Sequence, residues 1–408
     1  MLKRVDPPTR SAFLRALLKS PTNDEYAVAD KIGHFYGIDL MRGIAAITVL
    51  IWHYQHFYMT EGVKFVDGAP AIDRTIQPLY WLLYPIYENG FWAVNAFWVI
   101  SGFVFAHVYA GRETTAASFA GARFARLYPL HLITLITIAV IQEISFGLVH
   151  RYQIVGANDP ISFVLQLLFV SGWGFEHGGN FNGPIWSVSV EIAIYAGFFF
   201  VARRVLSLGL LIPAVIAGIC GILINNESPV WNFPLCGFFF FMGVSLYYWL
   251  LKFHRNVWMI AIPSVVSAAI FLYLVGSGQA AHMRFYDVQC FLFAPIVLLI
   301  GWLELFGPFR RLILPVKWIG DATYSTYLWH FPIQVLILTI FAYFGLSHSV
   351  FNNPATLIVW VIGMVLLAHL SFVKIERPLQ AFVKAKFREV TSGEPRPDAA
   401  RSKLSVKL

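Results

Sequence analysis

The chain has 408 residues, of which 58% are hydrophobic and only 13% are charged. Soluble domains average about 25% charged residues, so this composition excludes an ordinary soluble enzyme and indicates a protein that crosses a membrane several times. The formal net charge of +8 does not predict nucleic acid as a partner, because the lysines and arginines lie between apolar segments. All three cysteines lie inside apolar segments, which argues against a disulfide framework and against a metal site of the zinc type.

The first 35 residues are polar and basic, and we expect residues 1–35 to form a cytoplasmic lead-in to the membrane domain. Apolar and basic side chains alternate at helical spacing between residues 10 and 19. This pattern fits a short helix on the membrane surface, and it fits a disordered segment equally well.

Ten apolar segments follow, each with the length and composition of a membrane-spanning helix. They cover residues 38–58, 90–110, 127–149, 185–202, 205–224, 233–251, 257–275, 288–306, 323–345 and 355–374. An eleventh apolar run, Ile161 to Trp173, is too short to span a bilayer, so we expect a re-entrant or interfacial piece there.

The basic residues between these segments determine the expected topology. With ten spans and the N-terminus in the cytoplasm, most lysines and arginines of the loops fall on the cytoplasmic side, as the positive-inside rule requires. Counting the eleventh run as a span would put three basic clusters outside. We therefore predict an all-α transmembrane helical bundle of about ten spans, with both termini in the cytoplasm.

The chain divides into three parts in this interpretation. Residues 36–378 form the membrane domain, and residues 379–408 form a cytoplasmic tail. From Arg388 onward the sequence is rich in Pro, Ser, Lys and Arg and has no apolar periodicity. We predict that this tail is disordered.

The first span combines apolar sequence with Asp39, Arg42 and His53. A charge inside a spanning helix costs a few kcal/mol, so such residues usually face a protein interior. Arg42 and His53 are eleven residues apart, which on an α-helix is three turns plus about 20° and a rise of about 16 Å. We expect both on one face, with Arg42 near the cytoplasmic surface and His53 near mid-depth. The alternative is that Arg42 reaches the headgroups and His53 bonds to another helix.

Other polar residues lie inside or beside later spans. They are Asn95 and Ser101 in the second span, Arg123 and Arg126 one turn apart before the third, Trp186 and Glu191 in the fourth, and Tyr324 and His330 in the ninth. Small and polar residues often join membrane helices, so each has a structural alternative. An ionisable group at membrane depth needs a partner or a watery cavity, which favours a functional role for Glu191 and His330.

The order and wording of these motifs resemble the membrane acyltransferase 3 family. The resemblance rests on Arg42 followed after ten residues by His53, and then on NAFWVISGF, RFAR, WSVSVE, YSTYLWHFP and IERP. It extends from about Gly37 to Pro378 and departs from the family at Asn95, where an acidic residue is common. The resemblance implies an enzyme of the bacterial inner (plasma) membrane. Such enzymes transfer an acyl group, usually acetyl, from cytoplasmic acyl-CoA to a hydroxyl of an envelope or secreted glycan such as exopolysaccharide or lipopolysaccharide.

The residue types suit this chemistry. Acyl transfer to a hydroxyl needs a base or a nucleophile, and the pKa of histidine suits both roles near neutral pH. We therefore assign His53 as the base or transient acyl carrier, with Arg42 and Glu191 also in the catalytic group. The CoA phosphates would bind Arg42, Arg123 and Arg126. Substrate-binding or orienting roles are expected for His330, Asn95, Ser101, Trp186 and Tyr324, and no metal is expected.

Two other functions stay open at this point. A proton-coupled transporter or flippase of a glycan or small solute also needs buried His, Arg and Glu, although no inverted repeat is visible. A structural subunit of an envelope assembly would tolerate removal of the charges of Arg42 and His53. The sequence does not identify the acceptor, which could be lipid-linked, nor the linkage, the acyl group or the oligomeric state.

Overall fold

The structure is a computed structural model. It describes residue 22 and residues 33–58, 65–66, 69–70, 73–109, 112–176, 178–205, 209–224, 228, 230–283 and 285–392. The surface helix considered for residues 10–19 and the end of the tail from residue 393 lie outside these residues.

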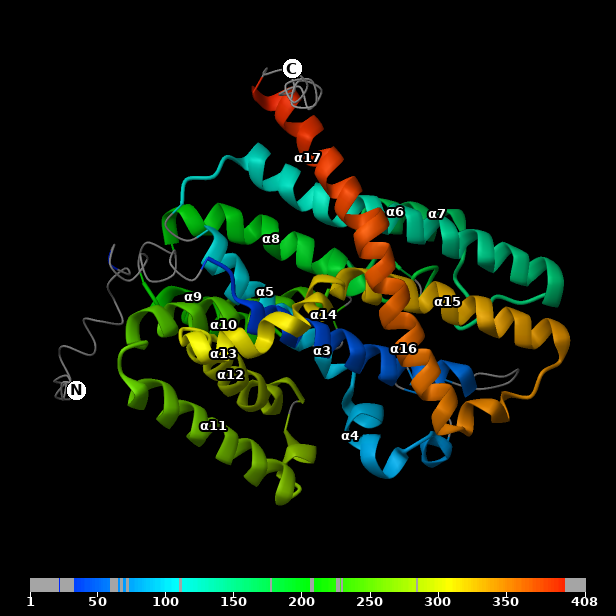
Figure 1. Ribbon diagram of the computed structural model, residues 1–408, viewed down its shortest axis with the longest axis horizontal. Coiled ribbons are helices and arrows are strands. Elements are labelled where there is room, and N and C mark those ends of the chain that lie inside the picture. The colour runs from blue at the N-terminus through cyan, green and yellow to red at the C-terminus, as the bar shows by residue number, and fades with distance from the viewer. Residues whose placement is uncertain are drawn as a thin grey trace, which may run out of the picture.

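Each of the ten predicted spans is a helix in the structure (Figure 1). They are α3 (Tyr36–Trp52), α5 (Trp92–Tyr109), α6 (Ala116–Val149), α8 (Ile185–Val205), α9 (Leu211–Leu223), α10 (Asn232–Phe253), α11 (Val257–Gly276), α12 (Phe285–Leu303), α15 (Thr323–Phe344) and α16 (Pro354–Ser371). Within the described residues, seven helices are long and apolar enough to cross a membrane. The all-α polytopic bundle is thus confirmed, whereas the ten spans and the cytoplasmic termini stay predictions.

Short elements connect these helices. They are η1 (His53–Tyr58), β1 (Phe65–Val66), β2 (Ala69–Pro70), η2 (Arg74–Ile76), α4 (Tyr80–Asn89), α7 (Pro160–Leu167), η4 (Gln279–His282), α13 (Gly307–Ile313), η5 (Leu314–Val316), α14 (Lys317–Asp321) and η6 (His348–Asn352). The two strands form one antiparallel pair. Helix α7 lies in the short apolar run and has eight residues, a length of about 12 Å, which is far less than the thickness of a bilayer.

The prediction of a disordered tail was wrong for residues 379–392. A five-residue π-helix, η7 (Phe372–Glu376), joins α16 to α17 (Arg377–Ser392), and together they form the long diagonal rod of Figure 1. Leu379, Phe382, Val383 and Phe387 recur at the i, i+3, i+4 spacing of an amphipathic helix, and Phe387 packs against Phe124 of α6. The high content of charged residues concealed this apolar face.

Helix α5 is fixed by close contact with α10. A Cβ atom on Gly102 would lie 1.8 Å from the carbonyl oxygen of Phe240, and one on Gly243 would lie 1.9 Å from that of Val99. The two backbones therefore touch, which only glycine permits at these positions. This contact sets where Phe97 and Ser101 of α5 are held.

Candidate active site

A cavity of about 370 Å³ lies between α3, α5, α6, α8 and α15, which is a volume typical of small-molecule sites. Three acidic residues line it, namely Asp39, Glu191 and Asp321. Four arginines also line it: Arg42, Arg112, Arg123 and Arg126. The remaining lining includes aromatic and apolar side chains of α5 and α15. The cavity is therefore suited to an anionic ligand that also has an apolar part.

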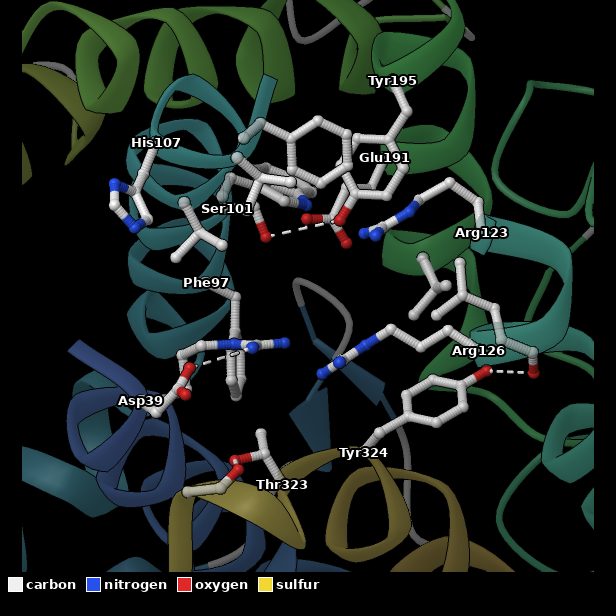
Figure 2. Close-up of a pocket in the computed structure, with 18 of the residues that line it drawn as sticks. Asp39, Phe97, Ser101, His107, Arg123, Arg126, Glu191, Tyr195, Thr323 and Tyr324 are labelled. Carbon is white, nitrogen blue, oxygen red and sulfur yellow. Dashed lines mark hydrogen bonds and ion pairs between the residues drawn. The ribbon is translucent and has the colours of Figure 1, made fainter. Parts of the chain in front are cut away.

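Arg123 and Arg126 point from α6 into this cavity (Figure 2). The guanidinium carbon of Arg123 lies 4.9 Å from the centre of the Phe105 ring and 5.8 Å from that of Tyr109. Neither arginine forms an ion pair or a hydrogen bond with any residue that the structure describes. Two guanidinium groups without a carboxylate partner, one helical turn apart, form a ready anion site.

Glu191 of α8 lies in the same cavity, near Arg123 (Figure 2). Its Oε1 atom is buried and has no hydrogen-bond partner. Beside it, the Tyr195 hydroxyl donates to Ser101 Oγ over 3.4 Å. The position of Glu191 balances part of the arginine charge while leaving one carboxylate oxygen available to a ligand.

His53 begins the 3₁₀-helix η1 and contacts His330 of α15. The Nε2 atom of His330 lies 3.2 Å from Nδ1 of His53, and this Nδ1 also lies 3.0 Å from the carbonyl oxygen of Val49. On the far side of His330, Nδ1 lies 3.2 Å from the carbonyl oxygen of Thr326. Gln334, one turn along α15, donates to the carbonyl of His53 over 2.8 Å. Three contacts therefore hold the two rings, and a fourth holds the backbone of His53.

The hydrogen-bond partners assign the tautomer of each ring. A carbonyl oxygen only accepts, so the Nδ1 atoms of His53 and His330 both carry hydrogen in the neutral rings. The hydrogen on Nδ1 of His53 then also faces the lone pair on Nε2 of His330. Consequently Nε2 of His53 has a free lone pair, and it makes no hydrogen bond to a described residue. That atom is the basic one in this arrangement.

The histidine pair and the arginine cavity do not share a surface in this structure. Arg42 lines the cavity, whereas His53 and His330 do not. Tyr327 connects the two regions, because it lines the cavity and its ring centre lies 6.0 Å from that of His330. The sequence predicted Arg42 and His53 on one face, and the structure adds an aromatic side chain between the regions where they lie.

Residues 35–373 match the family model described as an acyltransferase domain. The chain belongs to this acyltransferase family. It is therefore a membrane-bound O-acyltransferase, as the motifs of the first, second, fourth and ninth spans predicted. No solved structure matches the chain.

Several curated relatives of this acyltransferase carry names that agree with the family. The exopolysaccharide production protein ExoZ of Rhizobium meliloti (strain 1021) is 27% identical over 74% of this chain and 92% of its own length. BcsY of Komagataeibacter xylinus, named as a membrane-bound transacylase, is 25% identical over 79% of this chain and 84% of its own length. The acyltransferase MdmB of Streptomyces mycarofaciens is 36% identical over 26% of this chain and 27% of its own length.

Of the other residues predicted for the site of this acyltransferase, two line the cavity and two do not. Ser101 and Tyr324 line the cavity, and the Tyr324 hydroxyl donates to the carbonyl of Leu127 over 2.8 Å. Asn95 and Trp186 lie outside the lining: Asn95 donates to Gln289 over 2.6 Å, and Trp186 packs edge-on against Trp98. Their substrate-binding roles stay predictions.

Sequence reasoning missed Tyr327 and Gln334. They lie three residues before and four residues after His330, and at this spacing residues share the face of a helix with it. That periodicity was the available signal. Among the residues that the structure describes, no cluster of three His, Cys, Asp or Glu side chains has the geometry of a metal site, and a metal-free reaction stays a prediction.

Proposed function

We propose that this acyltransferase moves an acyl group, expected to be acetyl, from acyl-CoA in the cytoplasm to a hydroxyl of an envelope or secreted glycan. The single observation that carries the proposal is the arginine pair, Arg123 and Arg126, in a cavity whose lining residue Tyr327 also contacts His330 of the His53–His330 pair. The relative named as an exopolysaccharide production protein supports a carbohydrate acceptor. The predicted topology supports a donor that reaches the cavity from the cytoplasm. The protein itself would lie in the inner membrane of a bacterium.

The arginine cavity would bind the phosphates of CoA. Guanidinium groups bind phosphate with two parallel hydrogen bonds, and the contact is stronger when the arginine has no carboxylate partner. Arg123 and Arg126 meet this condition, whereas Arg42 lies 3.4 Å from Asp39. With the phosphates at Arg123 and Arg126, the apolar lining would receive the pantetheine arm, which points the thioester toward His53.

His53 would then act at the thioester. Its Nε2 lone pair removes the proton of the acceptor hydroxyl while the oxygen attacks the acyl carbonyl. A C–O bond forms, the C–S bond breaks, and the thiolate of CoA takes the proton from the imidazolium. During this cycle the carbonyl of Val49 and Nε2 of His330 stabilise the cationic ring at Nδ1. In the covalent alternative, the same lone pair attacks the thioester first and expels the CoA thiolate. The hydroxyl then attacks the acyl-imidazole, the C–N bond breaks, and the hydroxyl proton goes to the thiolate.

The proposal is tested with membrane vesicles from cells that carry the protein and its natural glycan. The vesicles are supplied with acetyl-CoA labelled in the acetyl group, and label is counted in the glycan and glycolipid fractions. We expect label in wild type and its loss in His53→Ala, with His369→Ala as the matched control on α16. If His53→Ala labels the glycan at the wild-type rate, the catalytic assignment is wrong. If wild type transfers nothing from any acyl-CoA while solute or glycan crosses the membrane, the protein is a carrier.

A further inference from the structure

Two aromatic rings of the cavity lining pack against each other, and one of them contacts the histidine pair. Phe97 of α5 and Tyr327 of α15 meet edge to face, with ring centres 5.8 Å apart, and both line the cavity. Figure 2 shows Phe97 across the cavity from Arg123 and Arg126. Beyond Tyr327 lies His330, and beyond His330 lies His53, at ring-centre distances of 6.0 and 4.8 Å.

The two rings differ in how firmly they are held. The Tyr327 hydroxyl donates to the carbonyl of Pro184 over 2.9 Å and lies 2.7 Å from Ser187 Oγ, at the start of α8. Tyr327 is therefore tied to a second helix. Phe97 has no polar atom to anchor it and is only partly buried in the apolar cluster that also contains Val49 and Tyr327. Phe97 is thus the ring that can move with the least loss of bonding.

Small side chains of α3 lie along the path between Arg42 and His53. By helical geometry, Ala46 and Val49 share the stripe of these two residues. Both are buried, and Val49 packs in the same apolar cluster as Phe97 and Tyr327. The surroundings of the two rings on the side of α3 are therefore apolar, which suits a short acyl chain and disfavours water.

We propose that Phe97 and Tyr327 form a gate that admits the thioester to His53 and sets the largest acyl group that the enzyme transfers. The inference rests on the proposed function, because it requires an acyl-CoA donor in the arginine cavity. A small acyl group passes with a limited rotation of Phe97, and each further methylene must displace more of the ring. One methylene in an apolar pocket changes kcat/KM by about 10- to 200-fold, so two rings suffice to select acetyl over butyryl.

The experiment compares acetyl-, butyryl- and octanoyl-CoA as donors to the glycan in the same membrane vesicles, at equal amounts of folded protein. Wild type is expected to prefer acetyl. In Phe97→Ala the ratio of butyryl to acetyl transfer should rise about tenfold or more. The matched control is Phe344→Ala, which removes an outward-facing ring that is 67% exposed on α15 and should leave the ratio unchanged.

A second variant tests the gate without opening a cavity. Tyr327→Phe keeps the ring and removes its bonds to Pro184 and Ser187, so it should fold like wild type. We expect it to release more free CoA thiol per acyl group transferred, because water reaches the thioester through the loosened gate. If both variants keep the wild-type donor ratio and the wild-type ratio of thiol to product, the gate is refuted while acyl transfer stands. If wild type transfers no acyl group from any donor, the proposed function fails first.

Discussion

His53 and His330 meet through a single contact between ring nitrogens, Nδ1 of the first and Nε2 of the second, across 277 positions of the sequence. The contact gives His53 a partner that accepts a hydrogen bond and has no negative charge. A carboxylate in this place would hold the proton on the ring more strongly. The neutral partner orients the imidazole and leaves its Nε2 atom without a hydrogen bond to a described residue.

Removal of the His330 ring should therefore slow the reaction without weakening donor binding. His330→Ala is expected to lower kcat by about 10- to 100-fold, less than the 10²- to 10⁴-fold loss expected for His53→Ala as the base. The KM for acyl-CoA should stay within about twofold, since His330 does not line the arginine cavity. His330→Gln, which can still offer an acceptor to Nδ1, should recover part of the rate. A rise in the KM for acyl-CoA as large as the fall in kcat would instead place His330 in the binding site of the acyl-CoA donor.

The sequence predicted the helices and several residues that line the cavity, because both depend on local pattern. Apolar length identified α5 and α6, and the R-x-x-R spacing placed Arg123 and Arg126 on one face of α6. The same helical argument placed Arg42 and His53 on one stripe. These inferences needed no knowledge of which helices are neighbours.

The remainder depended on contacts between distant segments. Glu304 follows α12, and its carboxylate accepts hydrogen bonds from the backbone N–H groups of Tyr36 and Gly37, which fixes the start of α3. Nothing near Glu304 in the sequence indicates this role. Likewise, the sequence places Glu191 in the catalytic group with His53, but Glu191 lies beside Arg123, because α8 packs against α5 and faces the cavity. Periodicity cannot tell which neighbouring helices a side chain faces.

The arginine pair should control the affinity for the donor. Arg123→Ala and Arg126→Ala are each expected to raise the KM for acyl-CoA by about 10- to 100-fold, since a charge-assisted hydrogen bond contributes about 1.5–3 kcal/mol. The lysine variants keep the charge and lose the two parallel bonds, so they should fall between alanine and wild type. Initial rates at varied acyl-CoA give the values, with Arg74→Ala, which lies outside the cavity, as control. Unchanged KM in both alanine variants would move the phosphate site elsewhere.

Gly102 should tolerate no larger residue. A methyl group at this position meets the carbonyl oxygen of Phe240 at 1.8 Å, and a backbone oxygen cannot rotate away as a side chain can. Gly102→Ala must therefore separate α5 from α10, which we expect to lower the free energy of unfolding by about 3 kcal/mol or more. Thermal unfolding of the purified protein, monitored by tryptophan fluorescence, measures the loss. Gly147→Ala on α6, where the new methyl group meets nothing within 4 Å, should unfold like wild type.

His34, which lies just before α3 at the edge of the cavity, should make stability depend on pH. The hydrogen bond that His34 donates to Asp39 raises the pKa of His34 above 6.5, and the negative charges of Asp39 and Glu304 act in the same direction. Nε2 of His34 lies 2.5 Å from Asp39 Oδ2. A histidine whose pKa is higher in the folded state stabilises the fold fully below its unfolded pKa. This stabilisation is lost as the pH rises through the folded value. The melting temperature of wild type should therefore fall relative to that of His34→Gln as the pH rises from below 6.5 through the pKa of His34 in the folded protein. A constant difference between the two proteins over this range would show that the ion pair does not form.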